Sequence, residues 1–488
     1  FTTDDKRSCV LLRLPFVVDP EAGVCQALPE LGHRQAYHFT AAGKLARMHT
    51  HVSPPERPVD VVRQLGPGLI ISANIVGAGE LIVTTKLGAD VGFTLLWFII
   101  LGCAVKVLLQ IELGRYAILN GKTTLQALDD VPGPRIKVSW MVWCWLAMFI
   151  ATFVQLSGIV GGVAGVLRTG GLDWPDWLLA LAITGSCGLL LVIGRYAFIE
   201  RFSTTMVAMF TLFTIAAVFS LNWTDFGITS DQVMHGLSFQ MPDDFMIAFA
   251  AFGVVGVGAS ELIYYPYWCL EKGYAKFVGP KEDSPEWIAR AQGWIRVLKW
   301  DAWVSMVIYT AATVAFYLLG AAVLNAQGLS VDNAGLVPTL SNMYTESFGA
   351  VGLWVFLIGS FLVLYSTVFI ATASNTRLSV DALQMFGAIK PVDEEGRRRW
   401  IQIAAIALPA LYFFAFVSIG SPVSLVLVGA IAQALMLPLL CIAALYHLYR
   451  HTVAELLPSL AFRFFLWISA SMIMITGVYQ LLKVTRLI

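Results

Sequence analysis

The sequence predicts an all-α integral membrane protein built from two oppositely oriented repeats of five helices, with an eleventh helix added. Three observations predict this fold. The composition is 58% hydrophobic and 13% charged, whereas a soluble chain is about half apolar and a quarter charged. Eleven apolar segments are long enough to cross a bilayer. One seven-residue phrase also recurs with six of its seven residues unchanged, in the first and in the sixth of these segments.

The predicted spans are measured against the ~20 apolar residues that cross the ~30 Å of hydrocarbon in a bilayer. They centre on residues 69–87, 92–119, 140–166, 177–193, 205–221, 245–270, 304–324, 351–372, 401–417, 423–446 and 461–482. Repeat one covers about 66–221, repeat two about 245–446, and the extra helix about 461–482. All of them belong to a transmembrane domain at residues 61–488, with the first and sixth spans broken.

Basic residues lie in alternate loops. The loops after the second, fourth, sixth and eighth spans contain Lys122, Arg135, Lys137, Arg201, Lys272, Lys276, Lys281, Arg290, Arg296, Lys299, Arg377, Lys390, Arg397, Arg398 and Arg399. The loops at 222–244 and 325–347 contain acids but neither Lys nor Arg. By the positive-inside rule this segregation predicts a multi-pass protein of the cell (inner) membrane, with a cytoplasmic N-terminus and an external C-terminus.

Residues 1–60 are polar and rich in Pro and charge, without a signal peptide. We expect a poorly ordered cytoplasmic tail there, and expect folding and transport to need only the chain from about Met48 onward.

The net charge is zero, so no bulk electrostatic attraction to nucleic acid applies. We expect a monomer in the lipid bilayer, without a cofactor. The cysteines lack CxxC spacing and are interpreted as packing residues: Cys9, Cys25, Cys103, Cys144, Cys187, Cys269 and Cys441.

The repeated phrase reads VGAGELI at residues 76–82 and VGASELI at residues 257–263. Its two copies are five spans apart, so they cross the membrane in opposite senses, as an inverted repeat requires. Glycines permit a helix to unwind there (Gly77 and Gly79, Gly256 and Gly258). Freed carbonyls and half-helix ends then make a polar site inside the membrane.

Each copy also contains an intramembrane glutamate, Glu80 or Glu261. Each would begin the second half of a broken helix, where the helix dipole favours a carboxylate. Ionisable residues at this depth are costly and usually mark a transport pathway. The alternative is a packing role, in which each carboxylate caps a helix or pairs with a buried base.

The stretch GPGLIISANIVGAGELIVTTKLGADVGFTLLW (66–97) resembles, without a gap, the first span of the Nramp-type divalent metal transporters of the LeuT-fold group. Weaker similarities lie in LLQIELGRYAILNGK (108–122), ATFVQLSG (151–158), GVVGVGASEL (253–262) and MLPLL (436–440). The resemblance implies a LeuT-type 5+5 fold and a transported divalent metal. The sequence contains no HExxH, GxSxG or phosphate-loop motif, so we do not expect an enzyme.

The chain departs from the pattern of the family at its metal site. The family's Asp-Pro-Gly-Asn run falls on residues 77–80, which read Gly-Ala-Gly-Glu, and its Met-Pro-His run falls on residues 260–262, which read Ser-Glu-Leu. The family's third-span acids, tied to its proton route, fall on Phe153 and Leu156. These differences predict a divergent branch with weak or no proton coupling.

The predicted metal ligands are Glu80, Glu261, Gly77 and Ser260. They offer only oxygen atoms, which suit hard divalent cations such as Mg²⁺, Mn²⁺ or Ca²⁺. The function predicted is therefore transport of such a cation, actively or by facilitation, through alternating access. The alternative is a LeuT-fold carrier of a small organic solute, with sodium coupling as an option, in which Lys106 and one Glu bind the ends of the substrate.

Further polar residues are candidates for cavity lining or charge balance: Lys106, Gln155, Gln433, Ser366 and Thr367. Lys106 can neutralise a glutamate or pair with Glu112. The two glutamines can line a cavity or join helices by hydrogen bonds. The two hydroxyls can reach an ion, although helical Ser and Thr usually bond back to their own turn. The aromatic run at residues 264–268 is interpreted as an interfacial belt in preference to a gate.

Overall fold

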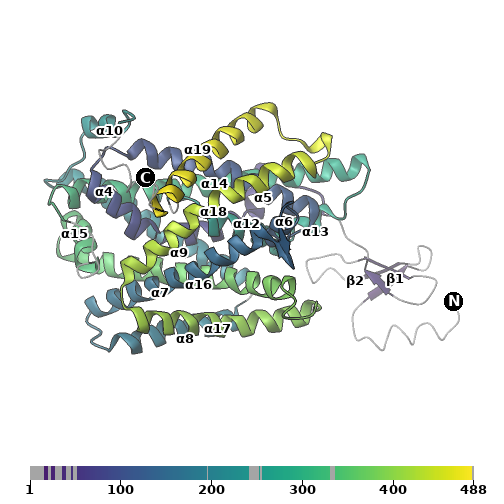
Figure 1. Ribbon diagram of the computed structural model, residues 1–488, viewed down its shortest axis with the longest axis horizontal. Helices are drawn as coiled ribbons and strands as arrows, with labels where there is room; N and C mark the ends of the chain where they lie inside the picture. The colour runs from purple at the N-terminus through teal and green to yellow at the C-terminus, as the bar shows by residue number, and fades with distance from the viewer. Residues whose placement is uncertain are drawn as a thin grey trace.

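The computed structural model describes residues 16–19, 24–27, 36–39, 45–47, 52–77, 79–194, 196–240, 252, 255–329 and 336–485. Within these residues the membrane domain is helical, as predicted, and helices run across it side by side (Figure 1). The unbroken spans are α5 (Leu96–Asn120), α7 (Trp140–Thr169), α8 (Asp176–Ile193), α9 (Tyr196–Ser220), α14 (Pro285–Leu319), α16 (Ala350–Met385), α17 (Glu394–Ile419), α18 (Pro422–Arg450) and α19 (Leu460–Val484).

The first span is broken where the glycines predict. It consists of α3 (Pro67–Ile75), the π-helical turn η2 (Gly79–Thr84) and α4 (Thr85–Val91), and its two halves differ in direction by 40°. The second half of the sixth span is α12 (Ala259–Lys272), and residues 255–258 before it are not helical. Gly256 has φ +64°, a left-handed conformation that glycine adopts without strain. Most of residues 241–254, the predicted first half, lie outside the described residues.

The packing of the helices follows the two-fold relation of an inverted repeat, in which span n corresponds to span n + 5. The third span packs on the tenth (α7 on α18), and the eighth packs on the fifth (α16 on α9). The first span packs on the fifth (α3 on α9), and the sixth packs on the tenth (α12 on α18). The extra helix α19 covers α5 and α18. The described helices therefore support two repeats in opposite orientation.

Short elements gather at the two ends of the bundle (Figure 1). The helices α6 (Thr124–Asp129) and α13 (Tyr274–Val278) lie at one end. The helices α10 (Ser230–Gly236) and α15 (Leu336–Phe348) lie at the other. The segments rich in Lys and Arg thus share one end, and the segments that lack them share the opposite end.

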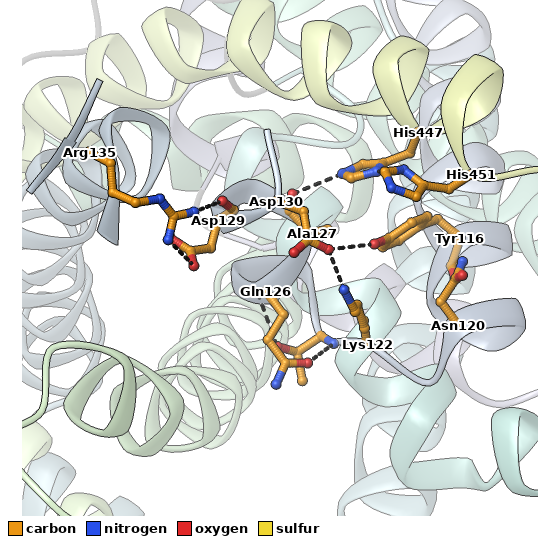
Figure 2. Close-up of polar contacts among 11 residues, drawn as sticks. Tyr116, Asn120, Lys122, Gln126, Ala127, Asp129, Asp130, Arg135, His447 and His451 are labelled. Carbon is orange, nitrogen blue, oxygen red and sulfur yellow. Dashed lines mark hydrogen bonds and ion pairs between the residues drawn. The ribbon is translucent and has the colours of Figure 1, made fainter. Parts of the chain in front are cut away.

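A polar network fixes α6 against the tenth span (Figure 2). Asp130 accepts hydrogen bonds from Lys122 at 2.5 Å and from the Tyr116 hydroxyl at 3.0 Å. His447 Nε2 lies 2.8 Å from the Ala127 carbonyl, and because a carbonyl only accepts, this nitrogen carries a proton. Burial alone would raise the pKa of Asp130, but the hydrogen bonds from Lys122 and Tyr116 and the charge of Lys122 lower it below its usual value.

The remaining elements are short. They are the strands β1 (Phe16–Asp19), β2 (Val24–Ala27), β3 (Ala36–Phe39), β4 (Leu45–Arg47), β5 (Arg135–Ile136) and β6 (Val138–Ser139), the helix α2 (Pro58–Gln64), and the turns η3 (Leu221–Trp223), η4 (Gly320–Asn325) and η5 (Ala454–Leu456). Strands β1 to β4 pair in order as an antiparallel sheet. Most of residues 1–51 lie outside the described residues, so the order of the tail and its role in transport stay predictions.

Candidate functional site

A small cavity of about 40 Å³ lies where the two broken helices meet α7, α16 and α18. Its lining includes the end of α3 and the start of α12, so the repeated phrase does mark a polar pocket. The lining residues are Asn74, Ile75, Gly79, Thr152, Gln155, Leu156, Ile159, Gly256, Ser260, Glu261, Tyr264, Thr367, Ala371 and Gln433. A cavity needs at least roughly 10–15 Å³ to hold one water, so this one has room for an ion together with water.

Glu261 is the carboxylate of the cavity lining, and only 8% of its surface is exposed. Its Oε1 accepts a hydrogen bond from the Asn74 side-chain amide, in the last turn of α3. The other end of this amide, Asn74 Oδ1, is buried and has no hydrogen-bond partner within the described residues. The first turn of α12 and the last turn of α3 thus place a carboxylate and an unpaired carbonyl oxygen at one cavity.

Ser260 lies beside Glu261. Its backbone N–H donates to Gln433 Oε1 at 3.1 Å, and Gln433 Nε2 donates to Gln155 Oε1 at 3.0 Å. The two glutamines therefore line the cavity and also join α7 to α18, which unites the two interpretations made from the sequence. The Ser260 hydroxyl is buried without a partner in the described part of the chain.

Gly77 packs against the eighth span at the break of the first. A Cβ at this position would overlap Thr367 Oγ1 and would come within 2.8 Å of the Asn74 carbonyl oxygen. Thr367 itself donates to the Val363 carbonyl at 3.0 Å, one turn earlier in its own helix. Ser366 does the same at 2.9 Å and also contacts the Ala73 carbonyl at 3.3 Å. Gly77 thus permits close approach of two helices, and both hydroxyls bond back as helical Ser and Thr usually do.

Glu80 is fully buried, and it is not among the residues that line the cavity. Its Oε2 accepts from the Thr84 hydroxyl at 2.6 Å, and its Oε1 accepts from the Gly256 N–H at 3.0 Å. Its carboxylate therefore reaches from the broken first span to the interrupted stretch of the sixth.

Lys106 is also fully buried, on α5. Its ammonium donates to the carbonyls of Phe252 and Val255, the latter at 2.8 Å. The pairing with Glu112 considered from the sequence is not found, because Glu112 binds Arg115 instead, with Nε to Oε2 at 2.9 Å. Positions i and i + 6 do not face each other on a helix, whereas i and i + 3 do.

The aromatic run at residues 264–268 is not an interfacial belt, and that interpretation is wrong. Tyr264, Tyr265 and Trp268 are at most 3% exposed. The Tyr264 hydroxyl donates to Asn375 Oδ1 at 2.7 Å while its ring lines the cavity. Tertiary packing against α16 buries a stretch whose composition is typical of a membrane surface.

A second, wider cavity of about 670 Å³ opens at the end of the bundle that carries the basic loops. Its lining includes Tyr267, Glu271 and Arg377. Contacts between α12 and α16 separate it from the small cavity. Trp268 Nε1 donates to the Ser374 hydroxyl at 3.1 Å, and the Arg377 guanidinium lies over the Trp268 ring while donating to Glu271 Oε1 at 2.6 Å.

Asn74, Thr152 and Tyr264 line the cavity but were not predicted to do so from the sequence. Asn74 had a usable signal, since an amide inside the apolar run IISANIV is costly in a membrane.

Five cysteines of the described residues are free thiols, four of them buried, as expected for packing. No group of three or more His, Cys, Asp or Glu side chains with metal-binding geometry occurs in the residues that the structure describes. Beside the Glu261 carboxylate, the polar side chains of the cavity lining are amides and hydroxyls.

Comparisons with known proteins agree with this architecture. The family model of natural resistance-associated macrophage protein-like (Nramp) proteins matches residues 68–483. An uncharacterized protein of Pasteurella multocida is 23% identical over 369 residues, 72% of this chain and 77% of that protein. The divalent metal cation transporter MntH of Mycobacterium tuberculosis is 24% identical over 271 residues, 54% of this chain and 58% of the transporter.

Solved structures show the same fold. A mutant of the Eremococcus coleocola manganese transporter superposes with a TM-score of 0.64 at 16% identity, covering 88% of each chain. MhsT in complex with L-phenylalanine superposes with a TM-score of 0.53 at 14% identity, covering 88% of this chain and 99% of MhsT. Similarity at this level of identity concerns the fold, and it confirms the predicted LeuT-type arrangement. The described residues contain nine helices long and apolar enough to span a membrane, or ten with the bent first span.

Proposed function

Because this chain belongs to the Nramp family, as the match over most of its length shows, we propose that it transports a hard divalent cation of the Mg²⁺, Mn²⁺ and Ca²⁺ class. The cation would cross by alternating access through the small cavity. Support comes from the relative named as a divalent metal cation transporter and from the oxygen atoms that face this cavity.

The main observation behind this proposal is that Asn74 Oδ1 and the Ser260 hydroxyl are buried without hydrogen-bond partners among the described residues. Buried polar atoms nearly always have a partner, and each exception needs an explanation. Here two such atoms stand at one cavity beside the Glu261 carboxylate. A carboxylate, an amide oxygen and a hydroxyl are ligands that hard cations take, and water can complete the shell. A bound cation explains both orphaned atoms at once.

The lining chemistry favours hard ions over softer transition metals. The cavity lining, as far as the described residues define it, includes neither Cys nor Met. Sulfur ligands select softer metals, whereas carboxylate, carbonyl and water suit Mg²⁺, Ca²⁺ and Mn²⁺. Mg²⁺ would keep several waters, because it dehydrates reluctantly.

The size of the cavity counts against the organic-solute alternative. Sites for organic ligands usually enclose about 300–1,000 Å³, whereas this cavity has about 40 Å³. Lys106, which that alternative assigns to the substrate, is instead occupied by backbone carbonyls. An ion with a few waters fits the cavity better than a solute with two charged ends.

We propose weak or absent proton coupling. Leu156 lines the cavity, and Phe153 packs edge-to-face against the Phe149 ring on α7. Neither side chain can carry a proton, and these are the positions where the family's third-span acids fall.

The release route would run into the wide cavity after the Arg377–Glu271 contact opens, and the positive-inside rule makes that side cytoplasmic.

The test is uptake of Mn²⁺, Mg²⁺ and Ca²⁺ into liposomes containing the purified protein, with a pH-sensitive dye inside. We expect uptake without comparable acidification. Glu261→Gln should lower uptake strongly, and Glu80→Gln should lower it by disturbing charge balance. Glu455→Gln, in the exposed turn η5, is the matched control. Uptake that is unchanged in Glu261→Gln would contradict the proposed site, and strong metal-driven acidification would contradict the absence of coupling.

A further inference from the structure

Lys106 is a buried cation that does not line the proposed metal cavity. It lies midway along α5 with none of its surface exposed. Its ammonium donates to the carbonyls of Phe252 and Val255 and lies 4.5 Å from the centre of the Phe252 ring. A charge inside a membrane protein is tolerated when it is paired and hydrogen-bonded. The carbonyls of the interrupted sixth span supply the hydrogen bonds, and the Phe252 ring adds a cation–π contact.

Glu80 binds the same interruption from the opposite side. Its Oε1 accepts from the Gly256 N–H at 3.0 Å, while Lys106 donates to the Val255 carbonyl at 2.8 Å. This carbonyl and this N–H belong to one peptide group. The positive charge therefore faces the negative end of a peptide dipole, and the negative charge faces its positive end. Each hydrogen bond polarises the peptide in the sense that strengthens the other.

Carbonyls released by an interrupted membrane helix are also the groups that coordinate a monovalent cation in transporters with broken helices. In this chain the ammonium of Lys106 already occupies them. We propose that Lys106 is a tethered counter-cation, which fills the place in the sixth-span break that a free Na⁺ would otherwise take and neutralises Glu80. This inference rests on the proposed function and adds that the cycle needs no coupling cation at this position.

Under this proposal the two glutamates have different roles: Glu80 is neutralised by Lys106, and Glu261 faces the transported ion. Lys106 interacts electrostatically with both glutamates, but its hydrogen bonds hold it at the break, next to the peptide that binds Glu80. Glu261 keeps only the amide of Asn74 as a side-chain partner among the described residues. Its negative charge therefore remains available to the transported ion, and Lys106 acts as a positioning residue, not as a ligand.

The first test is thermal unfolding of purified protein in NaCl and in choline chloride at equal ionic strength. Wild type should unfold at the same temperature in both salts. Lys106→Met leaves a buried carboxylate and two carbonyls without their cation. In choline its unfolding temperature should therefore be lower than that of wild type, and in Na⁺ it should be higher than in choline. Lys390→Met, at an exposed position, is the matched control. A Lys106→Met variant with no response to Na⁺ would overturn the inference, as would a wild type that is stabilised by Na⁺.

The second test is the double variant Glu80→Gln/Lys106→Met, which removes both charges. It should be more stable than Lys106→Met alone and insensitive to Na⁺, because residues in one hydrogen-bonded network couple in a double-mutant cycle. A double variant no more stable than the single one overturns the inference. If Lys106→Met does not fold, recovery of folded protein in the double variant supports it, and failure to recover overturns it.

Transport gives a separate readout. Mn²⁺ uptake by Lys106→Met should be lower than that of wild type in choline, because the buried Glu80 carboxylate loses its nearby cation, and should recover in Na⁺. Recovery in Na⁺ supports the inference, and equal uptake in the two salts overturns it. If wild type moves no divalent ion, the proposed function fails, while the unfolding measurements still decide the role of Lys106.

Discussion

Lys106 and Glu80 hydrogen-bond to the same peptide group of the interrupted sixth span, Lys106 to its carbonyl and Glu80 to its N–H. One residue comes from the second span and the other from the broken first span, so three spans meet at this peptide. The left-handed Gly256 allows the chain to turn there. The polar centre of the molecule is therefore organised in two adjoining parts. In one part, Lys106 and Glu80 hold the break through a shared peptide group, and in the other, a small cavity beside Glu261 is open to an ion.

Asn74→Ala removes one unpaired oxygen from the cavity and one hydrogen bond from Glu261. We expect apparent Mn²⁺ affinity to fall about 10–100-fold, the range for groups that orient metal ligands. Concentration-dependent uptake into liposomes measures this loss. Asn222→Ala, in the exposed turn η3, is the matched control and should behave as wild type. Unchanged affinity in Asn74→Ala would remove this residue from the site.

Gly77→Ala introduces a methyl group that overlaps Thr367 Oγ1. We expect a loss of about 1–3 kcal/mol in stability, as overpacking typically causes, together with reduced uptake. Thr367→Ala in the same chain should restore part of both, because it removes the overlapping oxygen. Gly185→Ala has open space around its Cβ and serves as control in thermal unfolding. A Gly77→Ala protein as stable as wild type would show that the close approach is not required.

Asp301→Asn tests the anchor of the first half-helix. The Asp301 carboxylate accepts from the N–H groups of Gly66 at 2.8 Å and Gly68 at 2.6 Å, at the start of α3. An asparagine there can accept one of these bonds but leaves the other N–H facing its own NH₂. The expected cost is about 1–3 kcal/mol for a buried unsatisfied group, seen as earlier thermal unfolding. Asp393→Asn should have little effect, since Asn is also a good N-cap.

Asp130 should make stability depend on acid pH. Its pKa is lowered below 3.8 in the folded protein, because hydrogen bonds and nearby positive charge outweigh its burial. A group with a lowered folded pKa stabilises fully above its unfolded pKa, and this contribution is lost as pH falls through the folded value. The difference in unfolding temperature between wild type and Asp130→Asn should stay constant above about pH 5 and shrink below about pH 4. A difference that grows on acidification would contradict this sign.

The sequence predicted the elements of this fold better than the contacts of its site. Runs of apolar residues define the spans, and the repeated phrase marks both breaks, because these features depend on local composition. The rotation of each helix depends on packing against its neighbours. For this reason the sequence placed Glu80 and Glu261 at the two helix breaks but could not show that, of the two, Glu261 lines the cavity and Glu80 does not. Likewise, Lys106 was recognised as a buried base, whereas its carbonyl partners come from a distant span.

The most direct test of the proposed cation site is anomalous scattering from crystals of the protein soaked in Mn²⁺. We expect one intramembrane peak within coordination distance of Glu261, with Asn74 Oδ1 and the Ser260 hydroxyl among its ligands. Glu80 should remain on the Gly256 N–H, and Lys106 on its carbonyls. A Mn²⁺ peak bound at Glu80 with Lys106 displaced, or a cavity without any peak at saturating Mn²⁺, would contradict the site described above.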